Sequence, residues 1–247
     1  MHFPDIFFEI HSDNPREGPG DNESTRKALS FVTDLPAEPL ILDIGCGLGM
    51  QTILLAQETN GRIIAIDTHQ PYLNVLGKNA KEKGLDNRIE TKLMSMYDLN
   101  FSKNTFDLIW SEGAIYIIGV RKGLRKWKKY LRDKAYLVFT EISWLRDDIP
   151  EDLRNFWEES YPDIKNISEN IKIIGDTGYQ MIHHFILPES SWFTHYYAPI
   201  EEKLAKLEVK YENDKKNLEV IKAEKDEIAM FRKYSKYYGY VFYIIMK

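Results

Sequence analysis

Apolar and polar positions follow two alternating periods in the first half of the chain. Short apolar runs, typical of buried strands, alternate with segments in which apolar residues recur at helical spacing. The strand-like runs cover residues 39–45, 62–67, 88–94, 105–111 and 134–142. Helical segments follow the first, second and fourth of these runs. This order predicts an α/β fold with a doubly wound, mostly parallel sheet that helices cover on both faces.

The pattern changes after residue 145. Two short helices are predicted within 146–178, and a strand follows at 179–188. The charged segment 199–237 then carries an apolar stripe at steps of three, four and seven residues, which indicates long amphipathic helices. The stripe consists of Ile200, Leu204, Leu207, Tyr211, Leu218, Ile221 and Ile228. A final apolar run, 238–247, predicts a last strand, so 199–237 is a helical insertion before it.

Three glycines stand within five positions in the stretch LILDIGCGLGMQTILLA, directly after the first predicted strand. A turn at this place lies at the carboxyl edge of the sheet, where open α/β sheets bind ligands. Gly45, Gly47 and Gly49 let a ligand approach the backbone, and the next helix offers its first N–H groups to an anion. The turn therefore predicts a ligand site.

The residues around this turn indicate which class of ligand it binds. A dinucleotide-binding turn needs a third glycine at position 50, where this chain has Met50. Asp43, two residues before Gly45, is not needed for a pyrophosphate. A carboxylate there suits a cationic ligand, because it can hold an amino group and balance a sulfonium charge.

Charge and composition count against several classes of partner. The net charge of −5 and the isoelectric point near 5.8 disfavour binding of nucleic acid through bulk electrostatics. The basic run 121–134 has helical spacing and indicates a solvated surface helix. No window approaches the ~18 apolar residues of a membrane span, and the N-terminus lacks a signal pattern, so we expect a cytoplasmic protein. Cys46 is the single cysteine, and ligand spacing predicts no metal site.

Four motifs occur in order over residues 35–145: LDIGCGLG, IIAID, KLMSMYDLNF and FDLIWSEGAIYIIG. Together they resemble the class I S-adenosylmethionine-dependent methyltransferases. The resemblance implies a Rossmann-like, seven-stranded sheet and S-adenosylmethionine as cofactor. Asp67, twenty-two residues after Gly45, corresponds to the acid that takes the ribose hydroxyls. The implied cofactor-binding residues are Asp43, Gly45, Cys46, Gly47, Gly49, Asp67, Thr68, Ser95, Met96 and Ser111.

The chain departs from the family pattern at two places. Ser95 stands where the family often has an acid beside the adenine, and Asp133-Lys134 replaces the usual glycine pair. At the exit of the fourth strand, Glu112 is the sharpest catalytic candidate, as a proton acceptor or as a partner for a substrate ammonium. The alternative is that Glu112 contacts the cofactor or caps the turn. Tyr116, one helical turn later, either lines the same pocket or packs.

The resemblance also implies the following domain organisation. Residues 1–247 form one methyltransferase domain, with a cofactor-binding core at 35–145 and an N-terminal lid and helix at 1–34. The helical segments 146–178 and 199–237 are interpreted as a cover over the substrate. The apolar stripe either mediates a homodimer or packs back onto its own domain. The aromatic run WFTHYYAP at 192–199 is either a cage for an amine, through cation–π contacts, or a hydrophobic hinge.

The expected activity is in-line methyl transfer to a small molecule with an amine, hydroxyl or thiol. Enzymes that methylate bases or amides have Asn/Asp-Pro-Pro-aromatic at the exit of the fourth strand, where this chain reads Ser-Glu-Gly-Ala. Two alternatives stay open. One is a nicotinamide-dependent oxidoreductase, and the other is a non-catalytic, cofactor-binding module that dimerises through 199–237.

Overall fold

The computed structural model describes residues 5–11 and 14–247, and within these ranges an eight-stranded sheet forms the centre of the molecule. Seven strands form a continuous path, and a two-residue strand, β6 (Lys165–Asn166), pairs with β5 beside it. In spatial order the path is β3 (Ile89–Leu93), β2 (Arg62–Asp67), β1 (Leu40–Ile44), β4 (Phe106–Ser111), β5 (Leu131–Trp144), β8 (Tyr238–Met246) and β7 (Gln180–Ile186). β8 runs antiparallel to both of its neighbours, and the other pairings are parallel. The predicted fold class is confirmed.

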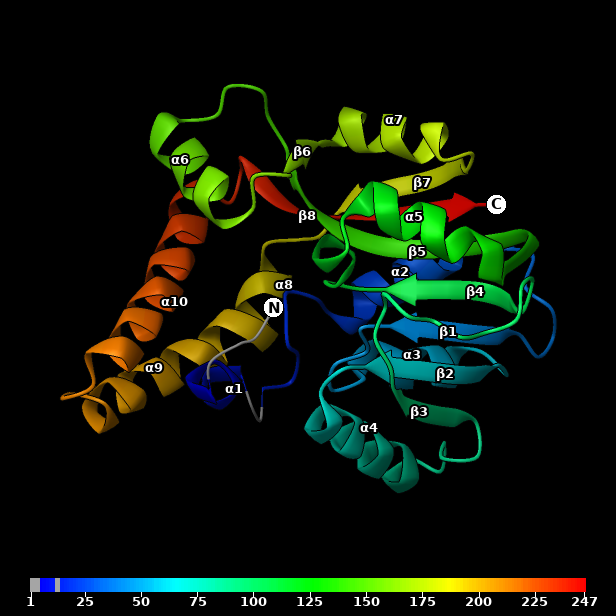
Figure 1. Cartoon of the computed structure of the whole chain (residues 1–247), viewed down its shortest axis with the longest axis horizontal. Helices are drawn as coiled ribbons and strands as arrows, with labels where there is room; N and C mark the ends of the chain where they lie inside the picture. Colours follow the sequence, from blue (N-terminus) through cyan, green and yellow to red (C-terminus); the bar gives the residue numbers. More distant parts are fainter. Residues whose placement is uncertain (1–4, 12–13) are drawn as a thin grey trace.

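Helices cover both faces of this sheet (Figure 1). The face packed in the larger core carries α2 (Asn22–Ser30), α3 (Met50–Glu58) and α4 (Gln70–Glu82). The opposite face carries α5 (Val120–Trp127) and α7 (Ile167–Asp176). The central strands are buried on both sides, as their continuous apolar sequences require, and β4 is buried at every position.

The register of the parallel strands sets the position of the candidate site. Ile44 at the end of β1 pairs with Ile66 in β2, and Asp43 pairs with Trp110 in β4. Parallel strands leave a sheet at the same edge. The glycine-rich turn after β1, the end of β2 and the exit of β4 are therefore neighbours at the carboxyl edge.

A second group of helices lies beyond the carboxyl edge of the parallel strands, on the left in Figure 1. It includes α1 (Asp5–His11), α6 (Glu151–Ser160), α8 (Ser190–Trp192), the π-helical turn η3 (Phe193–Tyr197), α9 (Ala198–Lys210) and α10 (Lys215–Tyr234). The predicted stripe of 199–237 lies on α9 and α10. Its members Ile200, Leu204, Leu207, Ile221 and Ile228 are buried in the core of their own chain. The stripe therefore packs back onto its own domain, and the homodimer stays a prediction without these side chains to support it.

Two element boundaries differ from the sequence pattern. The helix expected for the basic run 121–134 ends at Trp127 and is followed by one 3-10 turn, η2 (Lys128–Tyr130). β5 already begins at Leu131, because Leu131 pairs with Phe106 in β4. The register then shifts, and Lys134 takes a left-handed φ of 62°. The charged residues 132–134 lie in this irregular part of β5. Because they interrupt the apolar run, the sequence pattern placed the start of the strand at residue 134.

The N-terminal segment 1–34 was predicted to form a lid and a helix. Residues 1–4, 12 and 13 of that segment lie outside the described residues. The rest contains α1, which the hydrophobic pattern did not predict, and α2, whose N-cap Asp21 accepts a hydrogen bond from the backbone of Ser24. Among the described helices, none is long and apolar enough to cross a membrane.

Candidate active site

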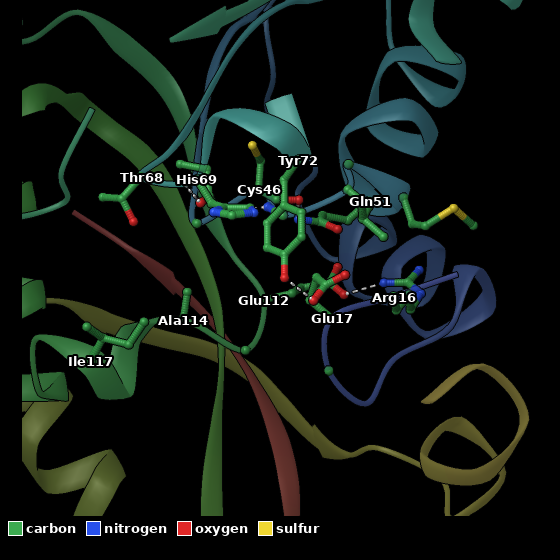
Figure 2. A pocket seen from close by; sticks show the side chains of 18 of the residues that line it. Arg16, Glu17, Cys46, Gln51, Thr68, His69, Tyr72, Glu112, Ala114 and Ile117 are labelled. Carbon is green, nitrogen blue, oxygen red and sulfur yellow. Dashed lines mark hydrogen bonds and ion pairs between the residues drawn. The ribbon is translucent and has the colours of Figure 1, made fainter. Parts of the chain in front are cut away.

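A cavity of about 470 Å³ opens at the carboxyl edge of the sheet (Figure 2). The glycine-rich turn and the start of α3 form one wall, and the end of β2 forms the next. The exit of β4, with the 3-10 turn η1 (Ile115–Ile117), and the N-terminal residues 15–19 complete the lining. Its size is within the range of sites that bind small molecules and cofactors, about 300–1,000 Å³.

The glycines of the turn are required by conformation and by packing. Gly45, Gly47 and Gly49 all have left-handed φ angles, 73°, 52° and 82°. A β-carbon at Gly45 would lie 2.4 Å from Ala114 Cβ, and one at Gly49 would lie 2.2 Å from Leu76 Cδ1. Gly45 and Gly49 thus let the turn pack on the exit of β4 and on α4. Gly47 instead faces the cavity.

Asp67 lies at the end of β2, beside this turn. Its carboxylate accepts hydrogen bonds from the backbone N–H of Gly47 (3.0 Å) and of His69 (2.9 Å). These two contacts fix the orientation of the side chain at the cavity wall. A carboxylate can accept about four hydrogen bonds, so Asp67 retains capacity for two hydroxyl donors of a ligand.

Asp43, predicted to contact the cofactor, does not line the cavity. It is fully buried beneath the turn, where it accepts hydrogen bonds from Thr52 Oγ1 (2.5 Å) and Gln51 Nε2 (3.2 Å). Burial raises the pKa of Asp43 to about 7. The side chain links β1 to the first turn of α3, and its Oδ1 has no hydrogen-bond partner among the described residues.

The other predicted cofactor residues divide into two groups. Those that line the cavity are Gly45, Cys46, Gly47, Gly49, Asp67, Thr68 and Met96. Ser95 and Ser111 do not. Ser111 is fully buried and donates to the Ile44 carbonyl (3.0 Å), while Ser95 Oγ accepts from the backbone N–H of Tyr97 (3.2 Å). Both hydroxyls stabilise local backbone, so the cavity wall beside Ser95 is formed by methionine side chains.

Glu112, the predicted catalytic residue, lines the cavity but has its two oxygens occupied. Thr25 Oγ1 and Trp110 Nε1 both donate to Oε1 at 2.8 Å, and Arg16 Nη1 donates to Oε2 at 3.3 Å. Burial raises the pKa of Glu112, although Arg16 and the two hydrogen bonds act to lower it. These three hydrogen bonds use most of the acceptor capacity of the Glu112 carboxylate, which leaves little for a substrate proton. The contacts favour the alternative, in which Glu112 fixes the segment around Arg16.

Glu17 and Tyr72 face the cavity from opposite sides. The sequence pattern did not predict a contact between them. Figure 2 shows the Tyr72 hydroxyl directed at Glu17, to which it donates at 2.6 Å. Burial raises the pKa of Glu17 to about 7. Glu17 Cγ would lie 3.3 Å from a β-carbon at Gly47, so the N-terminal segment passes directly over the turn.

Tyr116, the second catalytic candidate, enters the cavity from η1. Its ring contacts that of Tyr161 at a centroid distance of 6.0 Å. Burial is the first cause that raises the pKa of Tyr116, and the carboxyl groups of Glu227 and Glu141 add to it. Within residues 5–11 and 14–247, no group of three or more His, Cys, Asp or Glu could hold a metal ion.

Comparison with known proteins agrees with this geometry. A family model described as a methyltransferase domain matches residues 41–134, the segment that contains the turn, Asp67 and Glu112. Methyltransferase GfsG of Streptomyces halstedii is 26% identical over 110 residues, which cover 44% of this chain and 40% of that protein. The chain spans about half, or less, of the length of the curated relatives it matches.

Two solved structures share the fold over nearly the whole chain. An S-adenosylmethionine-dependent methyltransferase from Geobacter sulfurreducens, in complex with S-adenosylhomocysteine, has a TM-score of 0.84 and 20% identity over 99% of this chain and 98% of that one. A second one, from Thiobacillus denitrificans, also in complex with S-adenosylhomocysteine, has a TM-score of 0.84 and 19% identity over 100% of this chain and 99% of that one. Residues 41–134 thus match a methyltransferase domain, and the whole chain shares the fold of S-adenosylmethionine-dependent methyltransferases.

The protein carries four carboxyl groups whose pKa burial raises to near or above neutrality. They are Glu17, Asp43 and Glu227, with a pKa of about 7, and Glu141, with a pKa of about 8. In the unfolded chain these groups lose their protons near pH 4. Between about pH 4.5 and pH 8 the folded state therefore binds more protons than the unfolded state, and the free energy of unfolding falls as pH rises.

Urea unfolding of the ligand-free protein at pH 5.5 and pH 8 checks this expectation. One such proton corresponds to about 1.4 kcal/mol per pH unit, so the loss of stability should amount to several kcal/mol. The variant Glu141→Gln should show a shallower pH dependence, because it removes the group with the highest of the four pKa values. Stability that is constant or rises over this interval would contradict the protonated state of these groups.

Proposed function

We propose that the protein transfers a methyl group from S-adenosylmethionine to a small-molecule acceptor by in-line displacement. The observation that carries the proposal is the convergence of the glycine-rich turn and Asp67 on one cavity of about 470 Å³. The solved structures from G. sulfurreducens and T. denitrificans, which share the fold, contain S-adenosylhomocysteine. S-adenosylmethionine is accordingly the cofactor that this cavity suits.

The cavity residues fit such a cofactor. Gly47 leaves the turn without a side chain at its cavity face, directly opposite Glu17. Asp67 has carboxylate oxygens for the two ribose hydroxyls, and Met94 and Met96 offer apolar contact for the adenine. The turn and the start of α3 would then hold the amino-acid end. When bound, S-adenosylmethionine supplies an activated methyl group, so the protein needs neither a nucleophilic side chain nor a metal for this step.

The work left to the protein is alignment of the acceptor and exclusion of water. The segment 15–19 is suited to the second task, because it passes over the turn and is held by Arg16 on Glu112 and by Glu17 on Tyr72. This arrangement supports the lid that the sequence predicted for Arg16 through Gly20. The helices α6, α9 and α10 close the carboxyl edge and favour a small acceptor over a macromolecule.

A turnover assay tests the proposal. The purified protein is incubated with S-adenosylmethionine and a panel of small amines, alcohols and thiols, and release of S-adenosylhomocysteine is measured. We expect release with at least one acceptor class and none above background without acceptor. Tight binding of S-adenosylhomocysteine with no release across the panel would instead support the non-catalytic, cofactor-binding alternative.

A further inference from the structure

Around Tyr116, tyrosine and glutamate side chains from six parts of the chain lie within electrostatic range of one another. This tyrosine–glutamate cluster consists of Tyr116 (η1), Glu141 (β5), Tyr161 (after α6), Tyr196 (η3), Glu227 (α10) and Tyr240 (β8). It combines the end of β5 and the start of β8 with the helices beyond the carboxyl edge. The methyl transfer proposed above assigns no role to any of its members, although Tyr116 lines the cofactor cavity.

Hydrogen bonds and ring contacts define one side of the cluster. The Tyr161 hydroxyl donates to Glu141 Oε1 at 2.8 Å, and the Tyr161 ring contacts that of Tyr116. Glu141 is only 2% exposed, and its second oxygen, Oε2, has no hydrogen-bond partner in the described part of the chain. A buried, unpartnered carboxylate oxygen is costly, which points to a donor that binds there.

The other side of the cluster carries further unused polar groups. Glu227 accepts a hydrogen bond from Tyr197 at 2.9 Å. The hydroxyls of Tyr196 and Tyr240 form no hydrogen bond with another described residue. Both lie within electrostatic range of Glu227 and of Tyr116, so the polar ends of these side chains converge. Tyr240 also lies within range of Glu141, which joins the two sides.

The electrostatics of the cluster call for a cation. Neither Glu141 nor Glu227 forms a salt bridge with a Lys, Arg or His among residues 5–11 and 14–247. Burial raises the pKa of both groups, and Lys165 near Glu141 and His11 near Glu227 lower it by less than burial raises it. A cationic ligand would supply a compensating charge, and the tyrosine rings would add cation–π attraction. An anion would be repelled, and a neutral alcohol would leave both carboxyl groups uncompensated.

The cluster lies next to the cofactor cavity, where the methyl group of the cofactor would be. Ser111 at the end of β4 pairs with Phe139, so Glu141 lies two residues further along β5, at the same carboxyl edge. Tyr116 lines the cofactor cavity and belongs to the cluster as well. Tyr116, Tyr161 and Tyr240 are only partly buried, so a ligand can reach the cluster.

We propose that the tyrosine–glutamate cluster is the acceptor subsite and that the acceptor is a positively charged amine. This proposal rests on the methyl transfer proposed above. The positive charge of the bound ammonium lowers the pKa of Glu141, which then loses its proton to solvent and becomes a carboxylate. The ammonium group transfers a proton to this carboxylate and becomes a neutral amine. The nitrogen lone pair then forms the N–C bond to the methyl carbon while the C–S bond breaks and its electron pair stays on sulfur. The products are S-adenosylhomocysteine and an N-methylated ammonium ion, so charge and atoms balance.

A binding experiment tests the subsite without knowledge of the natural acceptor. The protein, saturated with S-adenosylhomocysteine, is titrated with tetramethylammonium and, separately, with neutral tert-butanol, and Tm is followed. We expect a rise in Tm with tetramethylammonium only. Glu141→Gln and Glu227→Gln should each weaken this response at least about tenfold in ligand concentration, since a charge-assisted contact is lost. The exposed Glu158→Gln, on α6, should respond like the wild type.

The readouts separate this proposal from the function on which it rests. Wild-type protein that binds S-adenosylhomocysteine but responds equally to both probes, or to neither, overturns the amine subsite and leaves the cofactor site intact. Protein that fails to bind S-adenosylhomocysteine overturns the proposed function instead. Unchanged S-adenosylhomocysteine affinity in both glutamine variants shows that they fold. A full tetramethylammonium response in those folded variants also overturns the subsite.

Discussion

Replacing Asp67 by alanine is expected to weaken S-adenosylhomocysteine binding by about 100-fold, because hydrogen bonds to a charged group contribute roughly 1.5–3 kcal/mol each. The carboxylate is available to two ribose hydroxyls in the proposed complex. It also holds the Gly47 N–H at 3.0 Å and the His69 N–H at 2.9 Å, so its removal loosens the turn itself. Isothermal titration calorimetry of the wild type and the variant measures the difference in affinity.

The control for this variant is Asp86→Ala. Asp86 is exposed in the turn before β3, at the opposite edge of the sheet. Its replacement by alanine removes the same charge from the protein. It should bind S-adenosylhomocysteine with wild-type affinity. If Asp67→Ala binds within threefold of the wild type, the ribose contact assigned to Asp67 is wrong.

Replacing Glu112 by alanine is expected to lower the free energy of unfolding by about 3–5 kcal/mol, the cost of breaking a buried ion pair by removing one partner. Arg16 would keep its charge with only 6% of its side chain exposed. Thr25 and Trp110, both fully buried, would lose the acceptor that they share. Urea unfolding at pH 6 measures the change.

The double variant Arg16→Ala/Glu112→Ala is the internal control for this contact. It should cost less than the sum of the two single variants, because each single variant leaves one charge unpaired. A Glu112→Ala protein within about 0.5 kcal/mol of the wild type, which is the usual range for a surface substitution, would contradict the anchoring role. If that stable variant also loses turnover, Glu112 is the catalytic residue that the sequence predicted.

The sequence predicted those parts of the site that depend on local geometry. A strand, a glycine-rich turn and a helix are contiguous, so the positions of Gly45, Gly47 and Gly49 follow from the pattern alone. Asp67 follows from the same logic, because it ends the next parallel strand and must emerge at the same edge.

The sequence could not assign side chains whose partners come from another element. Asp43 turns toward α3, where it meets Gln51 and Thr52, and Ser111 reaches across to the carbonyl of Ile44. Each stands at a family motif position, yet its side chain is used for packing the fold. Motif position alone does not distinguish a residue that contacts a ligand from one that supports the turn beneath it.

The two features with the greatest consequence for function depend on contacts between distant residues. Tyr72 and Glu17 are 55 positions apart, and Tyr161 and Glu141 are 20 positions apart. Tyr196 belongs to the aromatic run 192–199, which the sequence allows to be either an amine cage or a hydrophobic hinge. The structure buries Trp192, Tyr196 and Tyr197 of that run in the core, as a hinge requires, and Tyr196 also lies within electrostatic range of Glu227.

The central claim is that the cavity at the carboxyl edge is a site for S-adenosylmethionine rather than for a dinucleotide. Calorimetric titration of the wild-type protein with S-adenosylhomocysteine and, separately, with NAD tests it most directly. We predict saturable binding of one S-adenosylhomocysteine per chain and no detectable binding of NAD. Binding of NAD without binding of S-adenosylhomocysteine would contradict the account and support the oxidoreductase alternative.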